Sequence, residues 1–313
     1  MRLLTYAYRG DVRTGALHDD IIIDLNRAYA AAAAADPADA AVAGARVPTE
    51  MIALLQGGAA ALDAARAGVA YATALLATEG AALAAAGISA PAADVTLLPP
   101  VLRPTKVLAL GRNFRAHAAE MKEELPAYPM FFHKTADSLV GHGGAIRIPR
   151  GFTHVDYEGE MALIIGKTAR YVSVEDALDY VAGYTASNDV SERTLQSRTL
   201  QFTQGKMSDT FCPLGPVLTT ADEIADPQRL ALRTTLNGQV MQESTTAAMI
   251  FSVAEIIAYI TSFATLYPGD VILTGTPEGV GKARKPPVWL QPGDVISVYV
   301  EGVGEISNPV VAD

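Results

Sequence analysis

Two glutamates, Glu158 and Glu160, precede the apolar run MALII, with only Gly159 between them. Side chains alternate along a strand, so residues two apart point to the same face. Two carboxylates on one face repel each other unless a positive charge lies between them. Hard divalent cations such as Mg²⁺ take carboxylate oxygens as ligands. An exposed strand face is the other explanation of this spacing, but such a face should continue to alternate, whereas this run becomes apolar.

A third carboxylate and several polar groups follow a later strand-like run. Asp189 ends the segment YTASND, where an aspartate is also typical of a turn or a helix N-cap. Arg193 and Gln196 follow it, and a helix beginning at Asp189 would place all three on one face. Lys206 lies in the loop-like segment TQGKMSDTF. These groups could hold an anion, although each alone is also explained as a surface residue.

His117 and Glu120 are three residues apart in GRNFRAHAAEM, so one helical turn would place both on the same face. A carboxylate beside an imidazole orients its tautomer and stabilises its protonated form, which is the arrangement of a general base. The same spacing also fits a contact on a helix surface. Thr276 belongs to the tight loop LTGTPEGVG, which lacks the patterns of a phosphate-binding loop.

The elements that must position these residues are mainly strands. After Lys106, short β-rich runs recur between turns of Pro, Gly, Asp and Asn. One amphipathic helix, SVAEIIAYITSFATLY, has Ser252 as its expected N-cap and Glu255 at the capping-box position. Strands and helices do not alternate regularly, so a doubly wound sheet is not favoured. The expected fold class is α+β and rich in β structure, with a few helices packed against the strands.

The first 95 residues have a different composition. Residues 2–10 and 15–25 predict two short strands around a polar turn. Residues 28–86 are dominated by alanine and predict helices, broken at Pro37, at Pro48 and at the glycine pair that follows Gln56. The proline-rich residues 90–106 predict a linker or an extended crossing segment. We therefore expect a small N-terminal α/β domain, residues 1–95, followed by a larger domain, residues 96–313.

The composition limits the class of partner. The chain has 24 basic and 34 acidic residues among 313, a formal charge of −10. No net field attracts polyanions, so we expect no nucleic acid and no membrane as partner, whereas a small anionic substrate responds to local charge. The single cysteine, Cys212, cannot form an intrachain disulfide. We also expect no signal peptide and no membrane span, because charge and glycine interrupt the alanine-rich stretches. A cytoplasmic location follows as an expectation.

From about Pro104 to the C-terminus, the chain resembles the fumarylacetoacetate hydrolase (FAH) family. The segments that carry the resemblance occur in this order: KVLALGRNFRAHAAEM, VDYEGEMALIIGK, GYTASNDVSERTLQ, FTQGKMSDTFCPLGP, MIFSVAEIIAYITSFATLYPGDVILTGTPEGVG and RKPPVWLQPGDVISVYVEGVGEISNPV. The resemblance implies a metal-dependent enzyme with a catalytic domain built as a β-roll or sandwich. It also implies a homodimer.

The resemblance further implies a role for each candidate residue. The implied ligands of Mg²⁺ or Mn²⁺ are Glu158, Glu160 and Asp189. The implied catalytic residues are His117, Glu120 and Lys206. The implied substrate-binding residues are Arg193, Gln196, Lys206 and Thr276. Gly159 stands where the family has a bulkier residue, but its position faces away from the metal ligands.

The implied substrates are small anionic 2-oxo acids. We favour a hydrolase that cleaves a carbon–carbon bond in acylpyruvates or 2,4-diketo acids, with a metal-stabilised enolate and water activated by His117 and Glu120. The alternative is a decarboxylase, tautomerase, isomerase or dehydratase acting on a related 2-oxo acid, such as oxaloacetate or a 2-keto-3-deoxy sugar acid. A third hypothesis is a metal-stabilised binding protein without turnover, against which the retained carboxylates and the His–Glu pair argue.

Overall fold

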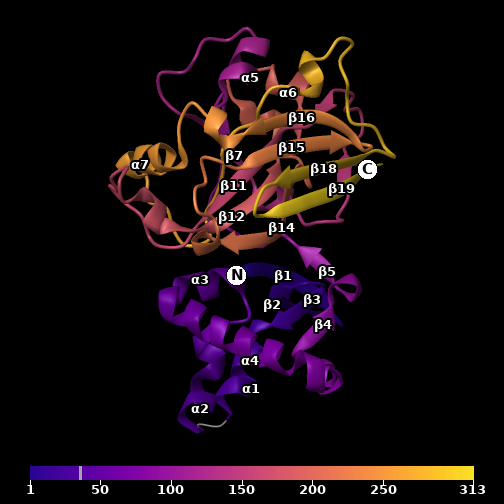
Figure 1. Cartoon of the computed structure of the whole chain (residues 1–313). Coiled ribbons are helices and arrows are strands. Elements are labelled where there is room, and N and C mark those ends of the chain that lie inside the picture. Colours follow the sequence, from indigo (N-terminus) through magenta and orange to yellow (C-terminus); the bar gives the residue numbers. More distant parts are fainter. Residues whose placement is uncertain (35–36) are drawn as a thin grey trace.

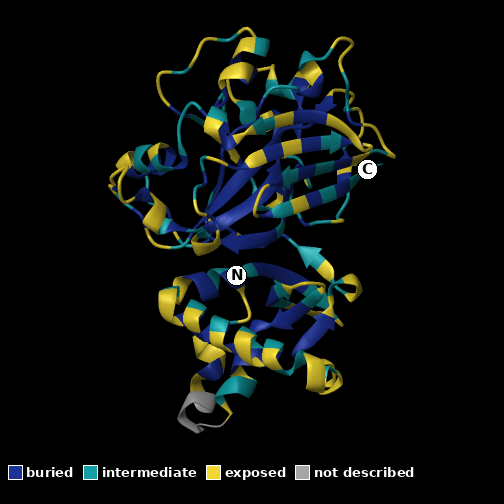
Figure 2. Ribbon diagram, viewed as in Figure 1, coloured by how far each residue is buried: buried dark blue, intermediate teal, exposed yellow. Residues whose placement is uncertain are grey.

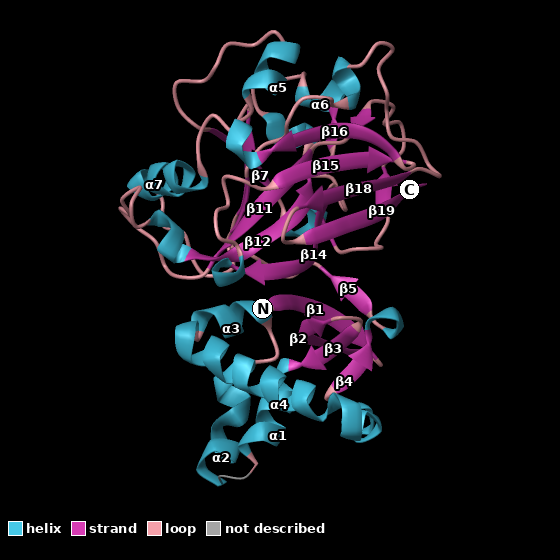
Figure 3. Ribbon diagram, in the orientation of Figure 1, coloured by secondary structure: helices cyan, strands magenta, loops and turns pink. Residues whose placement is uncertain are grey.

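The computed structural model describes residues 1–34 and 37–313, and the chain forms two lobes (Figure 1). The strands of the smaller, N-terminal lobe are β1 (Arg2–Tyr8), β2 (Asp11–His18), β3 (Ile21–Asp24), β4 (Ser89–Pro91) and β5 (Thr96–Leu98). Its helices are α1 (Leu25–Ala33), α2 (Pro37–Arg46), α3 (Met51–Gln56) and α4 (Gly58–Ala85). These helices lie together on one side of the strands (Figure 3).

The larger lobe is built mainly from strands (Figure 3). The strands are β6 (Val107–Gly111), β7 (Met130–Lys134), β8 (Leu139–Val140), β9 (Ile146–Ile148), β10 (Val155–Asp156), β11 (Gly159–Ile165), β12 (Val181–Asn188), β13 (Ser191–Glu192), β14 (Cys212–Thr220), β15 (Ala231–Leu236), β16 (Gln239–Thr245), β17 (Val271–Leu273), β18 (Val295–Val300) and β19 (Gly304–Ala312). The helices are α5 (Arg115–Glu120), α6 (Arg193–Gln196) and α7 (Val253–Phe263).

Two large sheets form the framework of the molecule, and the first of them includes strands of both lobes. The first has the order β4-β3-β2-β1-β14-β12-β11-β17-β6-β7, and the second has the order β16-β15-β18-β19-β9. Alternate apolar side chains of β11, including Leu163, share a buried cluster with Leu232 of β15 and Val298 of β18. Burial is therefore concentrated on the strands (Figure 2). The expected α+β, β-rich fold class is confirmed.

The two lobes share one hydrogen-bonded sheet. Strand β1 pairs with β14 in antiparallel register, with Leu3 opposite Leu218, and β5 pairs with β1. Residues 15–25, expected to form one strand, are divided into β2 and β3 by a turn at Asp19, whose φ is 50°. Aspartate is one of the few residue types that tolerate this left-handed conformation. The domain boundary at residue 95 stays a prediction.

The alanine-rich region is helical, as the sequence predicts. Helix α2 begins at Pro37, where a missing N–H costs no helical hydrogen bond. Helix α4 crosses α1 at Gly68, where a Cβ would lie 2.6 Å from the backbone nitrogen of Tyr29. Contrary to the sequence expectation, α4 is long and apolar enough, by length and composition, to cross a membrane. In this fold it packs against α1, and Arg66 joins it to the larger lobe through Asp222 at 3.0 Å.

The helix α7 has the N-terminus that the sequence predicts. The Ser252 side chain accepts a hydrogen bond from the Glu255 N–H, and the Glu255 carboxylate accepts one from the Ser252 N–H, which forms a capping box. One face of α7, including Ile256 and Ile260, packs into the same buried cluster as β11. This cap fixes where the helix begins relative to the core.

Gly159, the first residue of β11, lies where this strand contacts β15 of the second sheet. A Cβ at this position would overlap the hydroxyl oxygen of Thr234 on β15 and would lie 3.3 Å from Gln242 Oε1. The position therefore faces away from the carboxylates, as expected, and the close approach of β15 requires a glycine there. The missing side chain lets the two sheets approach each other beside the site.

We expect Gly159→Ala to lower the free energy of unfolding by roughly 1–3 kcal/mol, because the new methyl group overpacks the contact with Thr234. Removing the opposing hydroxyl in Gly159→Ala/Thr234→Ala should restore most of the loss. Urea unfolding of both variants and of Thr234→Ala alone measures this. A single variant as stable as the parent protein would show that the sheets do not meet as closely as the structure indicates.

Candidate metal and substrate site

Three buried carboxylates converge where two neighbouring strands meet. Strand β11 runs antiparallel to β12, with Glu160 opposite Ser187, so the start of β11 lies beside the end of β12. The Asp189 N–H continues this pairing by donating to the carbonyl oxygen of Glu158 at 2.8 Å. One carboxylate oxygen from each of Glu158, Glu160 and Asp189 lies within 4.8 Å of the others. The sheet register thus brings together residues that are about 30 positions apart in sequence.

Two buried lysines neutralise part of this cluster. Lys206 Nζ lies 2.7 Å from Glu158 Oε2 and 2.6 Å from Asp189 Oδ2, while Lys134 Nζ lies 2.6 Å from Asp189 Oδ1. Burial raises the pKa of Glu158, but the charges of Lys206 and Arg193 outweigh burial, so its net pKa lies below the ordinary value. Burial likewise opposes the charge on Lys206, but Asp189 and Glu158 raise its pKa. These shifts keep both Glu158 and Lys206 charged.

Among the described residues, no lysine or arginine forms an ion pair with Glu160. Its Oε2 accepts a hydrogen bond from the Gly275 N–H at 2.6 Å, whereas its Oε1 has no hydrogen-bond partner in the described part of the chain. Burial, and then the negative charges of Asp189 and Glu158, raise the pKa of Glu160 well above its usual value. Gly275 is required here because a Cβ would lie 2.7 Å from the Cβ of Asn113. The charge of Lys206 acts in the opposite direction but does not outweigh burial and the two negative charges, so the ionised form of Glu160 is disfavoured.

A divalent cation fits this set of donors. The cluster offers carboxylate oxygens only, which suit Mg²⁺ and Mn²⁺ better than softer metals. A cation bound to the unpartnered Oε1 would relieve the repulsion that raises the pKa of Glu160. The assignment of Glu158, Glu160 and Asp189 as ligands stays a prediction, and the convergence of their oxygens supports it.

Arg193 is fixed by two carboxylates. Its Nη1 lies 2.7 Å from Glu158 Oε1 and donates to Gln196 Oε1 at 2.9 Å, while its Nε donates to Asp156 Oδ2 at 2.8 Å. The expected helix from Asp189 is wrong, since α6 begins at Arg193. The short β10–β13 pair comes first, and the Glu192 side chain caps the helix by accepting from the Leu195 N–H. Arg193 and Gln196 nevertheless meet, and Asp189 is placed by its strand instead.

His117 and Glu120 form the expected pair on α5. The His117 Nδ1 lies 2.9 Å from Glu120 Oε1, and the carboxylate of Glu120 also accepts from the Gly279 N–H at 3.0 and 3.1 Å. Asn113 fixes the start of this segment, because its side-chain amide donates to the carbonyl oxygen of Thr274 at 2.7 Å. The pair is therefore tied to the loop that follows β17, beside the carboxylate cluster.

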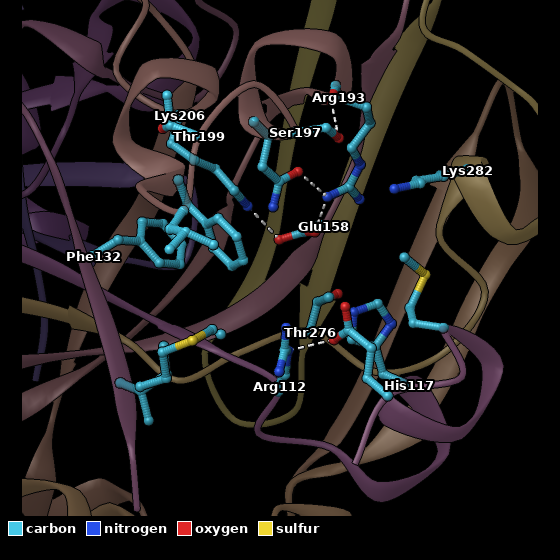
Figure 4. A pocket seen from close by; sticks show the side chains of 18 residues that line it. Arg112, His117, Phe132, Glu158, Arg193, Ser197, Thr199, Lys206, Thr276 and Lys282 are labelled. Carbon is cyan, nitrogen blue, oxygen red and sulfur yellow. Dashed lines mark hydrogen bonds and ion pairs between the residues drawn. The ribbon is translucent and has the colours of Figure 1, made fainter. Parts of the chain in front are cut away.

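A cavity of about 330 Å³ joins these groups (Figure 4). The candidate residues that line it are His117, Glu158, Arg193, Gln196, Lys206 and Thr276. Part of its wall is apolar, formed by Leu110, Met130, Phe132 and Phe202. Glu160 and Asp189 are completely buried and lie outside this lining. The hydroxyl of Thr276 donates to the carbonyl oxygen of Gly159 at 3.0 Å and accepts from Gln242 at 2.8 Å. Its hydrogen therefore already forms a hydrogen bond within the protein.

Sequence reasoning missed several charged residues of the site. Lys134 is the last residue of β7 and carries no local signal of its partner Asp189, which is 55 positions away. Asp156 could have been found, because DYEGE places carboxylates at alternate positions and Asp156 precedes Glu158 by two residues. Arg112 and Lys282, which also line the cavity, look like ordinary loop residues in the sequence.

Comparison with known proteins gives consistent results along most of the chain. A family model described as the fumarylacetoacetate (FAA) hydrolase C-terminal domain matches residues 106–311. The mitochondrial oxaloacetate tautomerase Fahd2a of Rattus norvegicus is 42% identical over 266 residues, which are 85% of this chain and 80% of the rat protein. The 2,4-didehydro-3-deoxy-L-rhamnonate hydrolase of Sphingomonas sp. (strain SKA58) is 44% identical over 228 residues, which are 69% of this chain and 80% of that protein.

A solved structure matches over the whole length. It is the maleylpyruvate hydrolase from Sphingobium sp. SYK-6 in complex with manganese(II) ion and pyruvate, at 32% identity and a TM-score of 0.71. The match covers 100% of this chain and 99% of the hydrolase. The smaller N-terminal lobe therefore has a counterpart in that structure.

Glu160→Gln tests the metal assignment without changing the shape of the side chain. The parent protein should gain about 2.7 kcal/mol of stability at a Mg²⁺ concentration 100 times the Kd, because only the folded state holds the site. We expect Glu160→Gln to lose this gain while remaining at least as stable as the parent protein without metal, since the amide cannot carry the charge that burial disfavours. Thermal unfolding with and without Mg²⁺ measures both. Glu243→Gln, an exposed control on β16, should keep the full gain, and a full gain in Glu160→Gln would exclude Glu160 as a ligand.

Lys134→Met tests the buried charge network. Removing Lys134 leaves Oδ1 of Asp189 without its cation, although Lys206 still contacts Oδ2 at 2.6 Å. Breaking one partner of a buried ion pair costs roughly 3–5 kcal/mol, and we expect a loss near the lower end of this range in the free energy of unfolding. Denaturant unfolding compares this variant with Lys167→Met, in which an exposed lysine changes in the same way. Equal stability of the two variants would mean that Lys134 does not neutralise Asp189.

Proposed function

The chain belongs to the fumarylacetoacetate hydrolase family of enzymes, and we propose that it interconverts the keto and enol forms of a 2-oxo dicarboxylic acid such as oxaloacetate. The observation that carries the proposal is that His117 and Glu158, a member of the acidic cluster, line the same cavity. The Nδ1 atom of His117 is held by Glu120. The choice of reaction is supported by the rat tautomerase, whose similarity extends over 85% of the chain.

His117 is the candidate that moves the proton. Its Nδ1 is engaged by Glu120, which leaves Nε2 to accept a proton from the carbon beside the keto group. The carboxylate of Glu120 stabilises the imidazolium that results, and its two contacts with the Gly279 N–H hold it in place. Returning the proton to the enolate oxygen gives the enol, and returning it to carbon regenerates the keto form.

The positive groups of the cavity support the negative charge that develops on the substrate. Arg193 and Lys206 are buried and charged beside Glu158, so they act in a region from which water is largely excluded. A divalent cation held by Glu158, Glu160 and Asp189 would act as a Lewis acid toward the keto oxygen and carboxylate of the substrate. We propose Mg²⁺ or Mn²⁺, and the manganese in the maleylpyruvate hydrolase complex supports this choice.

Hydrolysis of an acylpyruvate or 2,4-diketo acid, the reaction favoured from the sequence, is the second candidate. The observation in its favour is the apolar part of the cavity wall, formed by Met130, Phe132 and Phe202, which suits an acyl group. Two of the similar proteins are hydrolases by name. In this reaction His117 would take a proton from water instead of from carbon.

One assay separates the two reactions. The enzyme with Mg²⁺ is mixed with enol oxaloacetate, and the loss of enol absorbance is followed against a blank without enzyme. In parallel, the enzyme is given a panel of acylpyruvates and pyruvate release is measured. Faster loss of the enol supports the tautomerase, whereas pyruvate release from acylpyruvates without any effect on the enol would replace it with the hydrolase.

The homodimer, the cytoplasmic location and the lack of a nucleic-acid or membrane partner remain predictions from the sequence. The mitochondrial location in the name of the rat relative belongs to that protein. Sedimentation and cell fractionation test the first two.

His117→Asn should lower kcat by roughly 10²–10⁴-fold, because the asparagine cannot take up the proton. The stabilisation by Mg²⁺ should persist, since His117 is not a proposed ligand. Steady-state kinetics and thermal unfolding measure the two effects. The control is His133→Asn, an exposed histidine on β7, which should leave kcat unchanged. A His117→Asn variant with near-normal kcat would remove His117 from the mechanism.

A further inference from the structure

Lys282 differs from the other basic residues that line the cavity. Arg112 pairs with Glu123, Arg193 with Asp156 and Glu158, and Lys206 with Glu158 and Asp189. The Lys282 side chain lines the same cavity but makes no ion pair or hydrogen bond within residues 1–34 and 37–313. Its positive charge is therefore available to a ligand.

The backbone of Lys282 is held firmly even though its side chain is unpaired. Lys282 lies in the 3₁₀ helix Gly281–Ala283, and Asp156 accepts from the Gly281 N–H at 2.7 Å and from the Lys282 N–H at 3.0 Å. A Cβ on Gly281 would overlap the carbonyl oxygen of Val288, so this helix packs closely on its neighbours. Asp156 also binds Arg193, so the backbone of Lys282 is held at a fixed place relative to the guanidinium group of Arg193.

Lys282 lies where the end of a 2-oxo acid that is distant from its keto-acid group would be placed. Lys282 is exposed, whereas Glu158, at the acidic end of the cavity, is only 6% exposed. Figure 4 shows the ammonium group of Lys282 pointing into the cavity from the side on which Arg193 lies. A 2-oxo acid with its keto-acid end near Glu158 would direct its other end toward the rim.

We propose that Lys282 binds the distal carboxylate of a dicarboxylic 2-oxo acid and so selects such substrates over monocarboxylic ones. The inference rests on the proposed function and names the part of the substrate that the unpaired cation recognises. An ammonium group at the rim stabilises a carboxylate and gains nothing from an apolar tail. The positive charge of Lys282 also reduces, near the cavity, the electrostatic repulsion between a doubly charged substrate and a protein of formal charge −10.

Binding of a matched pair of acids tests the proposal. Calorimetry on the full chain loaded with Mg²⁺ compares 2-oxoglutarate with 2-oxovalerate, which has the same number of carbons and lacks the distal carboxylate. The wild type should bind 2-oxoglutarate several-fold more tightly, as an ion pair with an exposed lysine predicts. Lys282→Gln should bind the two acids about equally, with its affinity for 2-oxovalerate unchanged, and Lys282→Arg should keep the preference.

The matched control is Lys285→Gln, which removes another exposed positive charge three residues away and outside the cavity lining. It should keep the full preference for 2-oxoglutarate. A preference that survives in Lys282→Gln, equal binding of the two acids by the wild type, or no binding of either acid would overturn the proposal. Because binding is measured without turnover, a protein that prefers the dicarboxylate but does not accelerate the loss of enol oxaloacetate would refute the tautomerase alone.

Discussion

Burying an ionised carboxylate without a positive partner costs several kcal/mol. The register of the sheet places the side chain of Glu160 in such a buried position. Strand β11 is buried along its whole length, so Glu160 cannot turn toward water. Neighbouring carboxylates have cations of their own: Lys206 contacts Glu158 and Asp189, and Lys134 contacts Asp189. Glu160 keeps one backbone hydrogen bond and one unpartnered oxygen. A divalent cation bound here would supply a positive charge beside Glu160.

The other residues of the site are supplied by strand ends that meet around the carboxylate of Glu160. The end of β17 supplies the loop that binds Glu160 and Glu120 through the N–H groups of Gly275 and Gly279. The parallel strand β6 leads into α5 at the same edge of the sheet and delivers His117. Asp156 joins Arg193 to the 3₁₀ helix that bears Lys282. One network of charges and hydrogen bonds thus extends from the buried cluster to the rim of the cavity.

Local patterns predicted much of this arrangement. The period of two placed Glu158 and Glu160 on one face, and the helical spacing paired His117 with Glu120, as the 2.9 Å contact now shows. Contacts between distant segments were not predictable in this way. The role of Lys134 depends on Asp189, and the need for glycine at position 159 depends on β15 crossing beside it. The helix expected at Asp189 failed because residues 191–192 pair with β10 before α6 begins.

Anomalous X-ray scattering from crystals grown with Mn²⁺ tests most directly whether the three carboxylates bind a divalent cation. We expect one strong peak within bonding distance, about 2.1 Å, of one oxygen each from Glu158, Glu160 and Asp189. Oε1 of Glu160, which has no other partner in the described chain, should be among these oxygens. A strong peak at another position, or an empty cluster at a Mn²⁺ concentration that saturates the enzyme, would contradict the assignment.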